Sequence, residues 1–206
     1  LGREPTKPPT EPIFTYPYGV DVGGEGVPVI GQPSKDQFED LYDVIKKLQE
    51  KEEEGKDCWK VYLHLRGPAS SGQVLEGSVK CDRVFVIAHG KKQDGKDFVE
   101  LADGNLSVEL ANKIGKPYGG SCTGIGCSIG DNRFEVSQSG AVQQLIGKLK
   151  KLLDKGGCPC ESICIYSGPV NSDAKKPDFA TEADLPEGVQ EGLNKFIETN
   201  PPPVPK

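Results

Sequence analysis

The chain has 206 residues, of which 35% are hydrophobic and 27% are charged, and its formal net charge is −6. This composition is that of a globular protein and excludes fibrous and collagen-like classes, and no apolar run approaches the roughly 20 residues that a bilayer requires. The acidic balance argues against a nucleic-acid binder, which would carry a basic surface. No secretory signal begins the chain and it contains no Met, so we expect a mature product or part of a larger precursor.

Proline and glycine mark both ends of the chain and leave one domain between them. Residues 1–33 are rich in Pro and Gly with little apolar patterning, which predicts an extended arm or linker with at most an edge strand at 27–30. Residues 200–206 form a Pro-rich tail that stops any helix. We therefore predict a single α/β domain over residues 34–199.

In the first half of this domain, the apolar spacing predicts one helix and then three strands. A Ser/Gln capping-box pair precedes apolar residues at helical spacing, so a helix is expected over 35–53. Residues 59–65 are rich in strand formers, and residues 73–79 are interpreted as a short strand or hairpin arm. The continuous apolar run 83–88 is typical of a strand covered on both faces.

The second half alternates in the same way. A hairpin is expected around Asp103-Gly104, whereas the Gly-, Ser- and Cys-rich stretch 119–130 predicts no single element. The apolar spacing predicts helices over 106–114, 142–153 and 185–198, and a buried strand over 162–166. Strands separated by helices of this length predict a mostly parallel central sheet with helices on both faces.

The carboxyl ends of such strands are where ligands and catalytic groups gather. The apolar run 83–88 leads directly into His89-Gly90, and the motif Gly126-Cys127-Ser128 follows further along the chain. If Cys127 ends a neighbouring parallel strand, its thiol and the His89 imidazole can act as a Cys–His pair. The backbone N–H groups of Gly90 and Cys127 would then form the oxyanion hole. Cys122 remains an alternative nucleophile.

These motifs resemble those of the caspase-like (clan CD) cysteine peptidases, which include caspases, gingipains, CHAT-type peptidases and the autoprocessing domains of large bacterial toxins. The resemblance lies in an apolar strand ending in His89-Gly90 and a later Cys127 followed by a small residue and a glycine. Residues 101–111 are similar to a segment between these motifs in CHAT-like and toxin domains. The resemblance covers roughly residues 36–170.

The resemblance implies a caspase-like three-layer α/β/α fold and a cysteine endopeptidase that processes itself or is a secreted toxin or effector domain. In that family the thiol attacks a peptide bond and the histidine protonates the leaving amine, with no cofactor. Ser167 and Gly168 fall where the family places substrate-pocket residues. Asp131 and Asp173 would favour a basic substrate side chain, and Lys175 and Lys176 an acidic one; Asp173 is our candidate. The expected partner is a polypeptide substrate.

The cysteines also permit other interpretations of the sequence. Seven is an odd number, which in a secreted protein could mean three disulfides and one free thiol. Cys158, Cys160 and Cys164, with Cys122 or Cys127, could instead supply four thiolates to a structural zinc ion, although the spacing is unusual and we predict no metal. The main alternative to a peptidase is a non-enzymatic, disulfide-stabilised secreted or surface binding module. The compartment is not fixed by the sequence, and secretion or delivery within a larger protein is favoured.

Overall fold

The computed structural model of the chain describes residues 14–16, 20–22, 35–53, 56–64, 67–125, 138–155, 161–169 and 172–203. Its helices are α1 (Lys35–Glu50), α2 (Ser71–Lys80), α3 (Val108–Gly115), α4 (Gln138–Asp154) and α5 (Glu187–Thr199), with short 3-10 helices at Lys116–Tyr118 and Glu182–Asp184. Within these described ranges no helix is long and apolar enough to cross a bilayer.

A six-stranded sheet lies at the centre, in the order β1-β2-β5-β11-β6-β10. Its strands are β1 (Phe14–Tyr16), β2 (Val20–Val22), β5 (Trp59–His64), β6 (Arg83–Ile87), β10 (Ser121–Ile125) and β11 (Glu161–Ser167). Strands β5, β11, β6 and β10 are all parallel. Strand β2 joins β5 in parallel, and β1 is antiparallel to β2 at the edge. The prediction of an α/β protein with a mostly parallel central sheet is confirmed.

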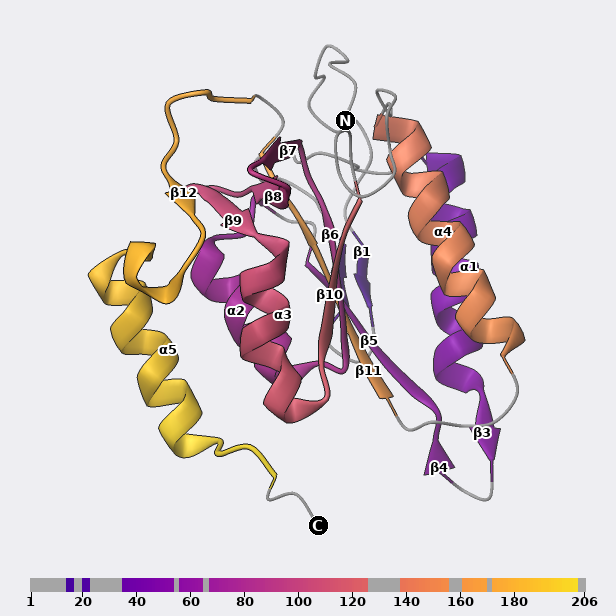
Figure 1. Ribbon diagram of the computed structural model, residues 1–206. Helices are drawn as coiled ribbons and strands as arrows, with labels where there is room; N and C mark the ends of the chain where they lie inside the picture. The colour runs from indigo at the N-terminus through magenta and orange to yellow at the C-terminus, as the bar shows by residue number, and fades with distance from the viewer. Residues whose placement is uncertain are drawn as a thin grey trace.

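Helices lie on both faces of this sheet, with α1 and α4 on one side and α2, α3 and α5 on the other (Figure 1). The strands supply each face by alternation, as expected for a period of two residues. In β6, Phe85 and Ile87 join the cluster under α1 and α4. Val84 and Val86 join the cluster under α2 and α3 instead. A strand buried on both faces must be apolar throughout, which explains the continuous apolar run.

Helix α2 replaces the strand or hairpin arm predicted over 73–79, so that prediction is wrong. Ser70 caps the helix: its hydroxyl accepts the N–H of Gln73, and the Gln73 side chain accepts the N–H of Ser70. This capping box starts a helix. Val74 and Leu75, and Val79 one turn later, then lie on one side of the helix and are buried against the sheet.

A second sheet, in the order β12-β9-β8-β7, extends from the carboxyl end of β6. Its strands are β7 (Gly90–Gln93), β8 (Lys96–Glu100), β9 (Asn105–Ser107) and β12 (Asp178–Phe179). The hairpin at Asp103-Gly104 is confirmed as the β8–β9 connection. A further hairpin, β7–β8, turns at Asp94-Gly95, where both residues have positive φ. The following helix begins at Val108 rather than at 106, because Ser107 caps it.

The remaining elements match the sequence closely. Helices α1, α4 and α5 and strands β5 and β11 lie where the apolar spacing predicted them. Strands β1 and β2 lie within the stretch predicted as an arm, and the edge strand expected at 27–30 lies outside the described residues. A small hairpin, β3 (Glu52–Glu53) with β4 (Lys56–Asp57), joins α1 to β5.

Candidate functional site

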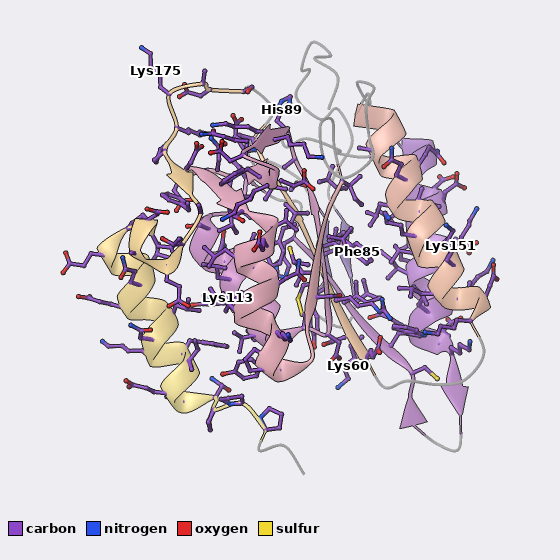
Figure 2. The ribbon with its side chains drawn as sticks, viewed as in Figure 1. Lys60, Phe85, His89, Lys113, Lys151 and Lys175 are labelled. Atoms are coloured by element: carbon purple, nitrogen blue, oxygen red, sulfur yellow. A yellow bond between two sulfur atoms is a disulfide. The ribbon has the colours of Figure 1, made fainter. Side chains whose placement is uncertain are left out.

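His89 lies at the carboxyl end of β6, as the sequence predicted, and the β7–β8 hairpin, which was not predicted, follows it directly (Figure 2). His89 is buried, with 7% of its surface exposed. Its neighbours in the chain are held by the adjacent strands, because the N–H of Ala88 donates to the carbonyl of Ile125 at 3.2 Å. On the other side, the N–H of Gly168 donates to the carbonyl of Ile87 at 2.8 Å. The imidazole is therefore carried by a backbone fixed between β10 and β11.

Strand β10 is the parallel neighbour of β6, with Ile125 paired to Ile87. Both side chains belong to the cluster under α1 and α4, so they share one face of the sheet. In the sequence, Cys127 follows Ile125 by two residues, just as His89 follows Ile87. Cys127 itself, with the rest of its motif and Asp131, lies outside the described residues. The structure thus shows the strand that leads to Cys127 beside the strand that leads to His89.

Cys122, the alternative nucleophile, lies away from this edge. It pairs with Val84 near the amino end of β10, and its residue is 5% exposed. Burial raises the pKa of the Cys122 thiol from 9.0 to about 12. Because the thiolate is the nucleophilic form, this side chain is not suited to attack a substrate at neutral pH.

The other described cysteines are engaged in disulfides. Cys81, at the end of α2, bonds Cys164 in β11, with the Cα atoms 5.9 Å apart. Cys58 is also disulfide-bonded. Cys164 is therefore unavailable to the zinc site considered above, and no group of three His, Cys, Asp or Glu side chains in the described part of the chain is placed to hold a metal ion. Cys158 and Cys160 lie outside that part.

The second histidine has a packing role. His64 ends β5, and its ring stacks on Tyr166 of β11 with centroids 4.8 Å apart and planes inclined by 7°. Tyr166 is buried, and burial raises the pKa of its hydroxyl to about 12. The stack fixes two adjacent strands, as aromatic pairs do.

Ser167 and Gly168, the predicted substrate-pocket residues, are closely packed at the carboxyl end of β11. Ser167 is fully buried, and its carbonyl accepts the N–H of Ala69 at 2.9 Å. A Cβ atom on Gly168 would collide with the Glu100 carbonyl and touch Ala88 at 3.0 Å. Only glycine permits this approach between the two strand ends. Ser167 therefore presents no hydroxyl at the surface.

Asp173, the predicted contact for a basic side chain, is exposed in the segment 172–176. That segment is held by Glu100, the last residue of β8, whose Oε1 accepts the Asp173 N–H at 3.0 Å. Lys176 is engaged, because its Nζ donates to the carbonyl of Leu101 at 2.9 Å and lies 4.0 Å from Glu100 Oε2. Lys175 points away from the molecule (Figure 2). The Asp173 carboxylate is at the surface as well, where its Oδ1 accepts the Lys175 N–H at 2.9 Å.

Sequence reasoning missed Glu100. A single glutamate among apolar residues gives no periodic or motif signal. Its significance comes from the β7–β8 pairing, which places it opposite His89: its N–H donates to the His89 carbonyl at 2.9 Å.

We compared the chain with models of protein families, with curated proteins and with solved structures, and none of these comparisons gave a match.

Proposed function

We propose that the chain is a cysteine endopeptidase with a caspase-like three-layer fold, in which Cys127 is the nucleophile and His89 the proton donor. The observation that carries the proposal is the register between β6 and β10, with Ile87 opposite Ile125. His89 and Cys127 follow these paired residues by the same two-residue step. Equal steps beyond a parallel pair favour side chains on the same face and at the same edge of the sheet.

The chemistry follows from the two side chains. The Cys127 thiolate would attack the scissile carbonyl carbon, forming a C–S bond and a tetrahedral oxyanion. Collapse would break the C–N bond while the His89 imidazolium gives its proton to the leaving amine. Water would then hydrolyse the thioester, releasing the acid product and returning the thiol. No cofactor takes part in these steps.

The Gly90 amide is a suitable oxyanion donor. Hydrogen-bonded and non-hydrogen-bonded pairs alternate along an antiparallel ladder. Because the Glu100 N–H donates to the His89 carbonyl, the next pair, Gly90 with Val99, is of the non-hydrogen-bonded kind. The Gly90 N–H is therefore directed away from β8. We propose that it stabilises the oxyanion together with the N–H of Cys127.

The test uses two pairs of matched variants on a panel of fluorogenic peptides. We expect Cys127→Ala and His89→Ala to lower kcat/KM by at least about a thousandfold, because each removes a group needed for covalent catalysis. Cys122→Ala and His64→Ala are the controls, and they should retain turnover. Full turnover in folded Cys127→Ala, or its loss only in Cys122→Ala, would contradict the assignment.

The disulfides favour a second candidate, a secreted or surface binding module without catalytic activity. Cys81–Cys164 and the bonded Cys58 are typical of a domain from an oxidising compartment. The two candidates differ in the state of Cys127. A peptidase requires one reactive thiol there, which a thiol-directed peptide probe and mass spectrometry would locate. Finding Cys127 in a disulfide would favour the binding module.

Self-processing within a larger precursor is part of the proposal, and its substrate would be the Pro-rich stretch that precedes the domain. Incubation of the purified chain followed by intact-mass analysis tests it. New termini that appear in the wild type and not in Cys127→Ala would support self-cleavage, whereas unchanged masses would count against it.

A further inference from the structure

Glu100 connects two parts of the proposed active site through different atoms. Its backbone N–H donates to the His89 carbonyl at 2.9 Å. Its side-chain Oε1 accepts two hydrogen bonds, from Ser172 Oγ at 3.1 Å and from the Asp173 N–H at 3.0 Å. The residue thus joins the backbone that carries His89 to the segment that carries Asp173.

The Glu100 side chain is 7% exposed, and a buried carboxylate is costly unless charges and hydrogen bonds compensate it. Lys176 supplies the opposite charge, with Nζ 4.0 Å from Oε2. Oε2 accepts no hydrogen bond from the described residues, so the compensation is incomplete. An apolar residue would fill this place without that cost. What the carboxylate provides in return is a fixed position for residues 172–176.

The base of this connection is rigid. The Glu100 carbonyl packs against Gly168 so closely that a Cβ atom there would collide with it. Gly168 in turn donates to the Ile87 carbonyl at 2.8 Å, two residues before His89. Any displacement of Glu100 relative to β6 would therefore break strand-end contacts. The Glu100 side chain holds Ser172 and Asp173, while Lys176 is also held by its bond to the Leu101 carbonyl.

We propose that Glu100 is a positioning residue that sets the 172–176 segment, and with it the Asp173 carboxylate, as the substrate-facing wall beside His89. This inference rests on the proposed peptidase function. Side-chain truncation should release the wall, and the backbone bond to His89 should survive it. Loss of substrate binding without loss of the chemical step is the expected signature.

In Glu100→Ala, we expect KM for the best peptide substrate to rise about tenfold or more, because two hydrogen bonds to a carboxylate are lost, while kcat changes by less than about threefold. Glu100→Gln keeps an amide oxygen for Ser172 and Asp173, so it should restore most of the KM. Ser172→Ala removes one of the two bonds without changing the buried charge. It should raise KM by a smaller factor, and it serves if Glu100→Ala does not fold.

The matched control is Glu161→Gln. Glu161 pairs with Arg83, Oε2 to Nε at 2.9 Å, where β11 and β6 of the central sheet begin, at the opposite end of these strands from His89. This change also removes a glutamate charge from an ion pair, so any general loss of stability should appear there too. Its KM should stay at the wild-type value.

Hydrogen exchange separates this inference from the proposed function. The Asp173 amide, a donor to Glu100, should exchange about tenfold faster in Glu100→Ala, and amides of β5 and α4 should not change. If no peptide is cleaved by the wild type, the peptidase proposal fails and the exchange result still decides whether Glu100 holds the segment. Unchanged protection of Asp173, or a fall in kcat as large as the rise in KM, would overturn the inference.

Discussion

Cys122 shows how burial alone decides the chemistry of a side chain. Its thiol pKa is raised to about 12 by desolvation. We therefore expect iodoacetamide at pH 8 to leave Cys122 unmodified in the folded protein and to modify it after denaturation, because only the thiolate reacts. Peptide mapping by mass spectrometry measures both states. Equal rates of modification before and after denaturation would show that the thiol is accessible.

The carboxylate of Asp178 gives a pH prediction at the same scale. Hydrogen bonds from Lys91 and Asn105 hold the pKa of Asp178 below its usual 3.8. A lowered folded-state pKa adds stability above the unfolded value and loses it as the pH falls through the folded value. Asp178→Asn should therefore lower the unfolding free energy at pH 7 by up to about 1 kcal/mol, since the pair is partly exposed.

The difference in unfolding free energy between the wild type and Asp178→Asn should disappear as the pH falls below the folded-state pKa of Asp178. Urea unfolding at a series of pH values measures it. A difference that stays constant down to pH 2 would mean that the Asp178 charge plays no part.

At the scale of the element, α2 contains two glycines that predict opposite effects. A Cβ atom on Gly77 would lie 2.5 Å from the Tyr166 hydroxyl and 2.8 Å from its ring, whereas one on Gly72 would lie 3.7 Å from Val189. Gly77→Ala should destabilise the fold by about 1–3 kcal/mol through overpacking. Gly72→Ala should stabilise it by up to about 1 kcal/mol, because Ala favours a helix.

Thermal unfolding of the two alanine variants gives the comparison directly, since both changes are the same and lie in one helix. If Gly77→Ala is as stable as Gly72→Ala, then Tyr166 is free to move and its packing against α2 is loose.

Helix α2 is also where sequence reasoning failed, and the reason is physical. Its window 73–79 contains two valines, one glycine and one serine among only seven residues, and these offset the helix preference of Gln73, Leu75 and Glu76, so local preference does not identify a helix. The capping box at Ser70 was the signal that could have identified the helix. By contrast, β6 and α4 were predictable because a continuous apolar run and a strong helical period leave few alternatives.

The candidate site, too, could be predicted only in part. The place of His89 was predictable, because an apolar strand ending in a histidine fixes its position at the sheet edge. The contacts of Glu100 were not, because they depend on the pairing of β7 with β8 and on residues more than seventy positions away, with a sequence separation of 73 to Asp173. Contacts between residues so far apart in the sequence are set by the tertiary fold.

At the scale of the whole molecule, the Cys81–Cys164 disulfide joins residues 83 positions apart. Closing a loop of this length restricts the unfolded chain and is worth about 4 kcal/mol in the chain-entropy model. We expect the double variant Cys81→Ala/Cys164→Ala to lose an amount of this order in urea unfolding. Cys122→Ala, which removes a thiol of similar burial without a cross-link, should lose much less. Equal losses would mean that the cross-link adds little.

The position of β11 has a consequence for biosynthesis. It lies between β5 and β6, yet it leaves the ribosome after both of them. Until residue 167 has emerged, the nascent chain holds two apolar strands whose facing edges have no partner, and such edges invite pairing with other chains. A nascent chain stalled at residue 155 should therefore bind chaperones strongly and release them when synthesis passes β11. Ribosome profiling with a crosslinkable chaperone would reveal that release, and equal binding at both lengths would contradict it.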